Sequence, residues 1–141
     1  MGLAVTVVAG TATGIVLWPD EPERVCARPA ELQARGGVTL TAEAMEAFRQ
    51  AETMAGQIEV IQSFRSCREQ ARACQRICGN RMGCPGTCAP PGLSWHQRGL
   101  AIDISEESLA DPGVIEALER MGWCQAVPQT DPGHFSFDGC H

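Results

Sequence analysis

Residues 94–103 have the sequence SWHQRGLAID, and the second half of this segment decides the fold. Apolar Leu100, Ile102 and Ile104 alternate with other residue types, the period of two that is typical of a strand with one buried face. Asp103 falls on the opposite face of that strand, away from the apolar side chains. The segment therefore predicts a half-buried strand that presents a carboxylate on its polar face.

Further elements are predicted upstream of this strand. Capping and apolar patterns predict a helix over residues 41–55, and alternation predicts a strand over residues 58–65. Ser66 and Glu69 form a capping box that opens a second helix. Residues 79–93 are rich in glycine, proline and cysteine, so they predict a loop.

The downstream part of the chain predicts one helix and two strands. Asp111 followed by Pro112 is typical of a helix start, and Gly122 stops that helix. Short strands are predicted over residues 123–127 and 134–137. Strands interrupted by helices, with hairpin-length gaps at the end, are typical of α+β proteins. We therefore expect a small antiparallel sheet with packed helices.

The composition is that of one globular domain. The chain has 141 residues, of which 44% are apolar and 20% charged, enough for a single hydrophobic core. Its net charge is -6, it has no lysine, and its arginines form no basic run. Because phosphate binding requires a concentrated basic face, we expect no nucleic-acid partner. We also expect the protein to be a monomer.

An uncharged apolar run, residues 2–18, is followed at once by prolines and acidic residues. It predicts an export element over residues 1–18, either a signal peptide or an uncleaved membrane anchor. A buried strand or helix of the core is the alternative. We then expect residues 19–40 to be a linker and entry segment. We also expect the protein to be extracytoplasmic and to touch a membrane only through this first segment.

Eight cysteines make disulfides the expected covalent feature of an exported domain of this size. Their number is even, but the connectivity cannot be deduced from the sequence. The spacings Cys74-x3-Cys78 and Cys84-x3-Cys88 leave a structural zinc site as an alternative, and a redox or metal-storage role as a weaker one. The disulfide candidates are Cys26, Cys67, Cys74, Cys78, Cys84, Cys88, Cys124 and Cys140.

Two of the three histidines, His96 and His134, stand near acids in loop-to-strand settings. A catalytic Zn2+ needs three nitrogen or oxygen ligands and one open position, and it accepts two imidazoles and a carboxylate. His96, Asp103 and His134 supply that set. Gly99 lets the chain turn between the first two, and Ala101 leaves space beside Asp103. We therefore expect one Zn2+ at these three residues.

Two further residues have the chemistry to act beside such a metal. Asp131, three residues before His134, is placed for a base that takes a proton from the attacking water; otherwise it is a turn residue. Arg65 can hold a substrate carboxylate or an oxyanion; otherwise it is a plain surface or salt-bridged arginine. Ser94 completes no catalytic triad and is expected to hydrogen-bond in a loop, while Trp95 either stacks on substrate or packs.

These residues resemble the motifs of zinc D-alanyl-D-alanine carboxypeptidases and related cell-wall endopeptidases. Residues 94–103 match the S-x-H-x-x-G-x-A-x-D motif of that family at every specified position, which is a specific signal. Residues 63–66, followed by Gln70, resemble its S-x-R-S segment. Residues 122–123 and 131–135 resemble its terminal Gly-Trp and acid-x-x-His elements, in the right order.

The resemblance covers roughly residues 58 to 137 and implies that residues 41–141 are a zinc peptidase domain. The implied fold is the small α+β sheet that these peptidases share with the amino-terminal signalling domain of hedgehog proteins. The resemblance implies that the two histidines and Asp103 hold one Zn2+, that Asp131 is the general base, and that Arg65 stabilises the transition state. The residues it implies for substrate binding are Arg65, Gln70, Ser94 and Trp95.

Two departures from the family pattern bear on the reaction. Carboxypeptidase members usually have Glu where this chain has Asp131, and often Trp where it has Gly133; the Asp is more typical of relatives that cut L-alanyl-D-glutamate bonds. We expect a D-Ala-D-Ala carboxypeptidase that acts on peptidoglycan stem peptides. The alternatives are an endopeptidase of the L-alanyl-D-glutamate type and a non-catalytic, zinc-stabilised module that binds the cell wall. The cysteine-rich loop from Cys74 to Cys88 is expected to set specificity.

Overall fold

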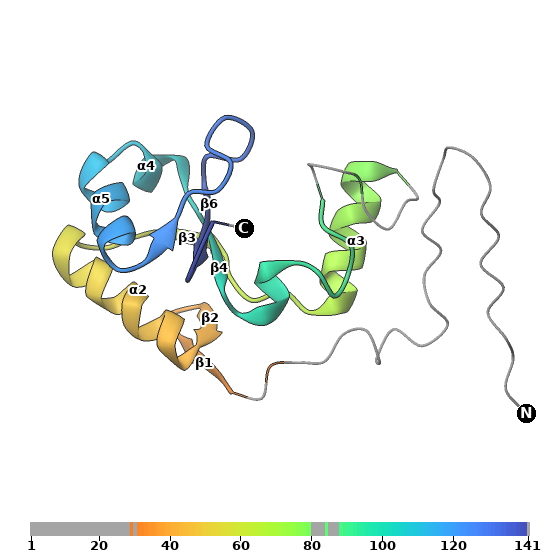
Figure 1. Ribbon diagram of the computed structural model, residues 1–141, viewed down its shortest axis with the longest axis horizontal. Coiled ribbons are helices and arrows are strands. Elements are labelled where there is room, and N and C mark those ends of the chain that lie inside the picture. The colour runs from red at the N-terminus through yellow and green to blue at the C-terminus, as the bar shows by residue number, and fades with distance from the viewer. Residues whose placement is uncertain (1–28, 30, 80–83, 85–87, 141) are drawn as a thin grey trace, which may run out of the picture.

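The computed structural model describes residues 29, 31–79, 84 and 88–140, which form two sheets and several helices (Figure 1). The larger sheet is antiparallel with the order β3-β4-β6-β5, and β1 and β2 form a separate hairpin. The predicted α+β class with a small antiparallel sheet is confirmed. In chain order the elements are β1 Leu32–Arg35, β2 Val38–Thr41, α2 Ala42–Ala55, β3 Val60–Gln62, α3 Cys67–Cys78, η1 Trp95–Arg98, β4 Ala101–Ile104, α4 Glu106–Leu109, α5 Pro112–Arg120, β5 Trp123–Cys124 and β6 His134–Phe137.

The helix ends follow the capping signals of the sequence. The hydroxyl of Thr41 accepts a hydrogen bond from the backbone of Ala44 at the start of α2, and Gly56 ends that helix with a φ of 90°. At the start of α3, Ser66 and Glu69 make both hydrogen bonds of the predicted capping box. The bond from the backbone N–H of Ser66 lowers the pKa of the Glu69 carboxyl. The start of α3 is therefore held in place by both reciprocal bonds.

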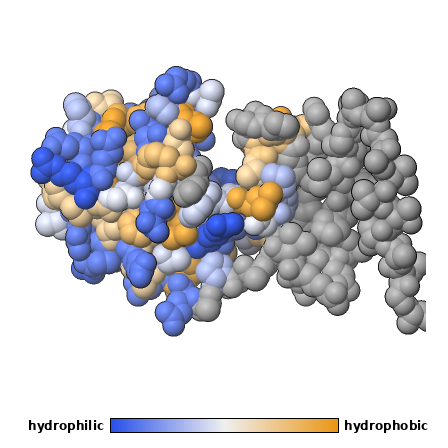
Figure 2. Space-filling view, in the orientation of Figure 1, coloured by the Kyte–Doolittle hydropathy of each residue, from blue (hydrophilic) through white to orange (hydrophobic). Residues whose placement is uncertain are grey.

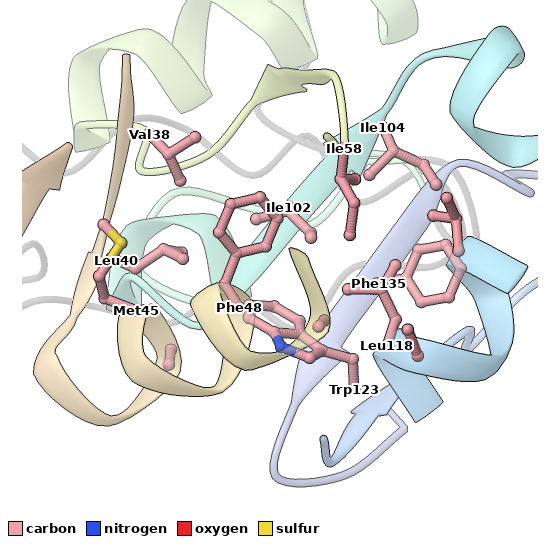
Figure 3. Close-up of a cluster of buried hydrophobic side chains, with 14 residues drawn as sticks. Val38, Leu40, Met45, Phe48, Ile58, Ile102, Ile104, Leu118, Trp123 and Phe135 are labelled. Carbon is pink, nitrogen blue, oxygen red and sulfur yellow. The ribbon is translucent and has the colours of Figure 1, made fainter. Parts of the chain in front are cut away.

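The core lies between one face of the larger sheet and helices α2 and α5 (Figure 3). Ile102 of β4 and Phe135 of β6 are fully buried in it, as the alternation of both strands predicts. Phe48 of α2 meets Trp123 of β5 edge to face, with ring centroids 6.5 Å apart. The outer faces of α4 and α5 are covered by hydrophilic residues (Figure 2). One face of the sheet is thus used for packing, which leaves the other for a site.

The predicted linker and entry segment over residues 19–40 overlaps the packed part of the chain, which begins with β1. Val38 and Leu40 of β2 are buried in the core. The turn of this hairpin is made by Gly36 and Gly37, both with positive φ, and a Gly-Gly pair beside alternating residues is a hairpin signal. The start predicted at residue 41 is therefore too late.

Other differences concern short elements. Strand β3 covers less than the predicted residues 58–65, and neither η1 nor α4 was predicted. Helix α4 begins at Ser105, whose hydroxyl accepts a hydrogen bond from the backbone of Ser108. The described residues contain no helix long and apolar enough to cross a membrane. The predicted export element over residues 1–18 lies outside the described residues.

Three disulfides join described cysteines, as predicted for an exported domain. The Cα–Cα distances are 5.5 Å for Cys74–Cys88, 5.7 Å for Cys78–Cys84 and 5.1 Å for Cys124–Cys140. Cys67 is also disulfide-bonded, and Cys26 lies outside the described residues. Because no described cysteine is free, the alternatives of a structural zinc site and of metal storage at the cysteines of α3 and its loop are wrong.

Candidate metal centre

Three potential metal ligands converge from three elements. One ligand atom from each of His96, Asp103 and His134 lies within 4.8 Å of the other two. His96 comes from η1, Asp103 from β4 and His134 from β6. The molecular surface is hollowed between the sheet-bearing body and α3, and these elements border that region (Figures 1 and 2). The structure thus brings together the three residues predicted to hold the metal.

The strand register places two of these ligands directly opposite each other. Asp103 of β4 is paired with His134 of β6, and paired residues of an antiparallel sheet project from the same face. Their neighbours Ile102 and Phe135 form the next pair and point into the core. The distance from Nδ1 of His134 to Oδ1 of Asp103 is 2.9 Å. A shift of one residue in this register would send one ligand into the core.

The third ligand, His96, is held by a backbone carbonyl. Only 4% of His96 is exposed, and its Nδ1 donates a hydrogen bond of 2.7 Å to the carbonyl oxygen of Ser63. This bond turns Nε2 toward the site, where it lies 3.2 Å from Oδ1 of Asp103. A carbonyl that orients the far nitrogen is the usual outer partner of a metal-binding histidine.

Ser63 is the functional residue that the sequence analysis missed. Its hydroxyl accepts a hydrogen bond of 2.9 Å from the backbone of Thr39 in β2, while its carbonyl accepts the hydrogen bond from Nδ1 of His96. The serine lies in the S-x-R-S segment, which marked the region but not the part played by its backbone. A carbonyl acceptor is present in every residue, so no residue type signals it.

Gly99 forms the turn between the first two ligands, as predicted. It has a φ of 68° and ends η1, and its carbonyl accepts a hydrogen bond of 3.0 Å from Thr41. A Cβ at this position would lie 2.6 Å from the side chain of Leu32 and 3.1 Å from the backbone nitrogen of Thr41. The β1–β2 hairpin therefore packs directly against the turn that presents His96, which is a contact only glycine permits.

The charge balance of the site depends on Asp103. Burial raises the pKa of this carboxyl, but hydrogen bonds and charge from His134 and His96 outweigh burial and hold the pKa well below its usual range. Nη2 of Arg65 lies 3.8 Å from Oδ2 of the same carboxylate. Asp103 is therefore an anion at neutral pH, as a metal ligand must be. Two imidazoles and one carboxylate that converge in this way fit a single Zn2+ with a position left for water or substrate.

Arg65 stands beside the centre and is held at both ends of its guanidinium group. Nη1 donates a hydrogen bond of 2.7 Å to the side-chain oxygen of Gln70, and Nη2 faces Asp103. Its backbone nitrogen also donates to the carbonyl of His96. Arg65 is therefore a held charge next to the three ligands, in an ion pair with Asp103, and its role toward substrate or transition state stays a prediction.

Ser94 and Trp95 border the centre without entering the cluster of ligands. Ser94 is buried at the start of η1, and its carbonyl accepts a hydrogen bond of 3.1 Å from the backbone of Gln97. The guanidinium carbon of Arg98 lies 4.8 Å from the centroid of the Trp95 ring, a cation–π contact. Their substrate-binding roles stay predictions.

Asp131 lies in an exposed turn that leads into β6. Its backbone nitrogen donates to the carbonyl of Val127, and its own carbonyl accepts a hydrogen bond of 3.2 Å from His134. Its carboxylate is not a member of the cluster of potential ligands among the described residues. Asp131 is thus tied to the second histidine by the backbone, and its role as base stays a prediction.

Close packing of β6 against β4 accounts for Gly133, where the family often has Trp. The carbonyl of Gly133 accepts a hydrogen bond of 3.0 Å from the backbone of Ile104. A Cβ at Gly133 would lie 2.9 Å from the carbonyl oxygen of Ile104, an approach that requires a backbone shift. A larger side chain at this position therefore requires a different path of the strand beside His134.

Gly133→Ala is expected to lower the free energy of unfolding by about 1–3 kcal/mol, because its methyl group meets backbone that cannot move aside freely. Urea denaturation measures this change. Gly113→Ala is the control, since the nearest atom to its added Cβ, at 3.1 Å, is a side-chain oxygen of Asp111 and not backbone. Equal losses in the two variants would contradict the packing argument.

Comparison with known proteins shows solved structures of similar fold. The structures of VanYB in complex with D-alanine-D-alanine and of the LdcB LD-carboxypeptidase align with TM-scores of 0.58 and 0.59 at 19% and 20% identity. The first alignment covers 78% of both chains, and the second covers 85% of this chain and 79% of the other. No curated protein matches the sequence.

A third similar structure contains the metal. It is the E175A mutant of the D,D-pentapeptidase VanY in complex with Zn(II), with a TM-score of 0.53, 20% identity and coverage of 78% of this chain and 79% of the other. Fold and site together define a cell-wall peptidase. Within that class the chain belongs to the VanY D-alanyl-D-alanine carboxypeptidase family, whose model matches residues 38–130. The predicted family is confirmed.

Proposed function

We propose that this protein is a zinc-dependent D-Ala-D-Ala carboxypeptidase that acts on peptidoglycan stem peptides. The observation that carries the proposal is the convergence of His96, Asp103 and His134 on the open face of the sheet. The Zn2+ would be held by these three side chains, and when bound it would supply a Lewis acid and lower the pKa of water.

The other residues of the site supply binding and proton transfer. Arg65 offers a fixed positive charge that can hold the terminal carboxylate of the substrate or the negative charge that develops during attack. Asp131 takes the proton from the attacking water and later returns it to the leaving amine. The position of Asp131 directly before β6 supports this role, since its backbone carbonyl accepts a hydrogen bond from the backbone of His134.

An endopeptidase of the L-alanyl-D-glutamate type is the second candidate. It is favoured by Asp131 and by the close packing at Gly133, which excludes the Trp that many carboxypeptidases carry there. A non-catalytic zinc module that binds cell-wall peptide is the third. Both use the same metal ligands, so only the products separate them.

Product analysis tests the proposal. The zinc-loaded protein is incubated with defined stem pentapeptide and tetrapeptide, and the products are identified by mass spectrometry, with EDTA-treated protein as control. We expect the pentapeptide to lose one D-alanine only when zinc is present. Cleavage of the tetrapeptide alone would instead indicate an LD-carboxypeptidase, and a cut after L-alanine an endopeptidase. Retention of peptide without any product would contradict an enzyme.

We also propose that the protein is exported and acts outside the cytoplasm. Disulfides support this location, because they persist in oxidising compartments. Peptidoglycan peptide is then the main partner, the protein is a monomer, and membrane contact is confined to residues 1–18. Fractionation of cells, with detection of the protein by antibody, tests the location.

A further inference from the structure

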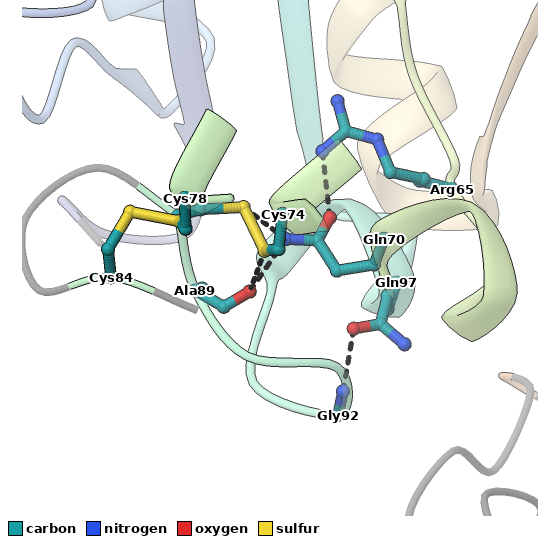
Figure 4. The surroundings of a disulfide bond; sticks show 9 residues. Arg65, Gln70, Cys74, Cys78, Cys84, Ala89, Gly92 and Gln97 are labelled. Atoms are coloured by element: carbon teal, nitrogen blue, oxygen red, sulfur yellow. Dashed lines mark hydrogen bonds between the residues drawn. A yellow bond between two sulfur atoms is a disulfide. The ribbon is translucent and has the colours of Figure 1, made fainter. Parts of the chain in front are cut away.

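A line of contacts runs from a disulfide of the cysteine-rich loop to Arg65, which stands beside the candidate metal centre (Figure 4). Gln70 of α3 is 2% exposed, and its side-chain oxygen accepts the hydrogen bond from Nη1 of Arg65. Its side-chain nitrogen donates a hydrogen bond of 2.7 Å to the carbonyl of Ala89. The same nitrogen lies 3.6 Å from the sulfur of Cys74 and 3.5 Å from that of Cys88. Gln70 thus joins the disulfide to the arginine.

Both polar atoms of Gln70 are used, which limits what this side chain can do. A buried amide with its oxygen on Arg65 and its nitrogen on Ala89 cannot turn without losing two hydrogen bonds. Gln70 therefore reaches the candidate centre through Arg65, and its predicted part in substrate binding stays a prediction. Its orientation depends on where the carbonyl of Ala89 lies.

The disulfide decides the position of that carbonyl. Ala89 directly follows Cys88, and Cys88 is bonded to Cys74 on α3, one turn of helix beyond Gln70. The other end of the loop is tied to η1 by a hydrogen bond of 2.7 Å from the backbone of Gly92 to the side-chain oxygen of Gln97. Only the first of these two attachments faces Gln70.

We propose that the Cys74–Cys88 disulfide positions Arg65, by fixing the carbonyl of Ala89 that orients Gln70. The inference rests on the proposed function in one respect only, the role of Arg65 toward the substrate. Without this disulfide, Cys78–Cys84 still ties the loop to α3, but the bond that holds Cys88 and Ala89 beside Gln70 is gone, and the buried amide nitrogen of Gln70 loses its acceptor. Gln70 then turns to find another, and Nη1 of Arg65 loses its partner.

The test compares two disulfides of the same loop. Cys74→Ala/Cys88→Ala removes the one that contacts Gln70, and Cys78→Ala/Cys84→Ala removes the other as a matched control. In the zinc-loaded proteins we expect kcat/KM on the cleaved stem peptide to fall at least about tenfold in the first variant, the scale of one lost hydrogen bond to a charged group. The control is expected to stay within about twofold of the native protein, and zinc content to be unchanged in both.

Gln70→Met keeps the volume of the side chain and both disulfides but removes the hydrogen bonds. If the disulfide acts through Gln70, this variant loses about as much kcat/KM as Cys74→Ala/Cys88→Ala, and the combined variant loses little more. Additive losses would overturn the proposal, since they would mean that the disulfide acts by another route. Gln70→Met also decides the question if the cysteine variant does not fold: unchanged kcat/KM would overturn the proposal.

A readout that needs no activity keeps the inference separate from the proposed function. The 15N–1H resonance of Arg65 Nε, assigned by its loss in Arg65→Lys, reports the surroundings of the guanidinium group. We expect it to shift in Cys74→Ala/Cys88→Ala and in Gln70→Met but not in Cys78→Ala/Cys84→Ala. If the native protein cleaved no peptide, the proposed function would be contradicted. The Arg65 resonances of the variants would still show whether the Cys74–Cys88 disulfide positions Arg65. Equal shifts in both cysteine variants would overturn it.

Discussion

His96→Ala is expected to abolish zinc binding and hydrolysis together. The substitution removes one of three ligands and leaves the carbonyl of Ser63 without the imidazole that it now receives. Because loss of an outer partner alone costs about 10–100-fold in metal affinity or activity, we expect loss of a direct ligand to lower kcat/KM by more than about 100-fold. Zinc content by elemental analysis should fall from one per chain to near zero after dialysis.

Thermal unfolding provides the control for that loss. Zinc that binds only the folded state raises Tm, so EDTA should lower the Tm of the native protein and leave that of His96→Ala unchanged. A variant that is folded and insensitive to EDTA has lost the site and not the fold. Full zinc content with full activity in His96→Ala would refute the ligand set.

Asp131→Ala is expected to lower kcat by about 10²–10⁴-fold, the range for loss of a general base, with zinc content unchanged. The carboxylate of Asp131 is outside the cluster of potential ligands, so its removal takes away no bond to the metal. The hydrogen bond from His134 goes to the backbone carbonyl of Asp131, which alanine keeps. Steady-state kinetics on the cleaved stem peptide, with zinc analysis of the same sample, measure both quantities.

Two further variants separate the base from the turn residue. Asp131→Asn keeps the shape and turn chemistry of the side chain but cannot take a proton, so it should lose as much kcat as Asp131→Ala. Asp131→Glu, which restores the residue usual in carboxypeptidases, should lose less than either. If Asp131→Asn instead kept native kcat while Asp131→Ala lowered only Tm, the turn role would stand and the base assignment would fall.

Local patterns predicted most of the elements because each depends on residues near one another in the chain. The caps at Thr41 and Ser66 and the alternation around Asp103 describe contacts within a few residues, and all are present. The β1–β2 hairpin was not predicted, although Gly36 and Gly37 at its turn are a local signal for it.

The substrate-binding roles were harder to predict because they depend on contacts between distant segments. Gln70 was predicted to bind substrate from its place in the motif, yet its side-chain amide is hydrogen-bonded to both Arg65 and Ala89. Only the pairing of Cys74 with Cys88 explains this arrangement, and eight cysteines leave their pairing undetermined by sequence.

The sequence by itself determined the family and named the three candidate metal ligands, because spacing and residue type are enough to state that chemistry. Tertiary structure decided how those ligands meet. The pairing of Asp103 with His134 is a matter of strand register, and the orientation of His96 depends on the backbone carbonyl of Ser63. Register and carbonyl position arise from packing across the whole chain, and residue types alone do not encode them locally.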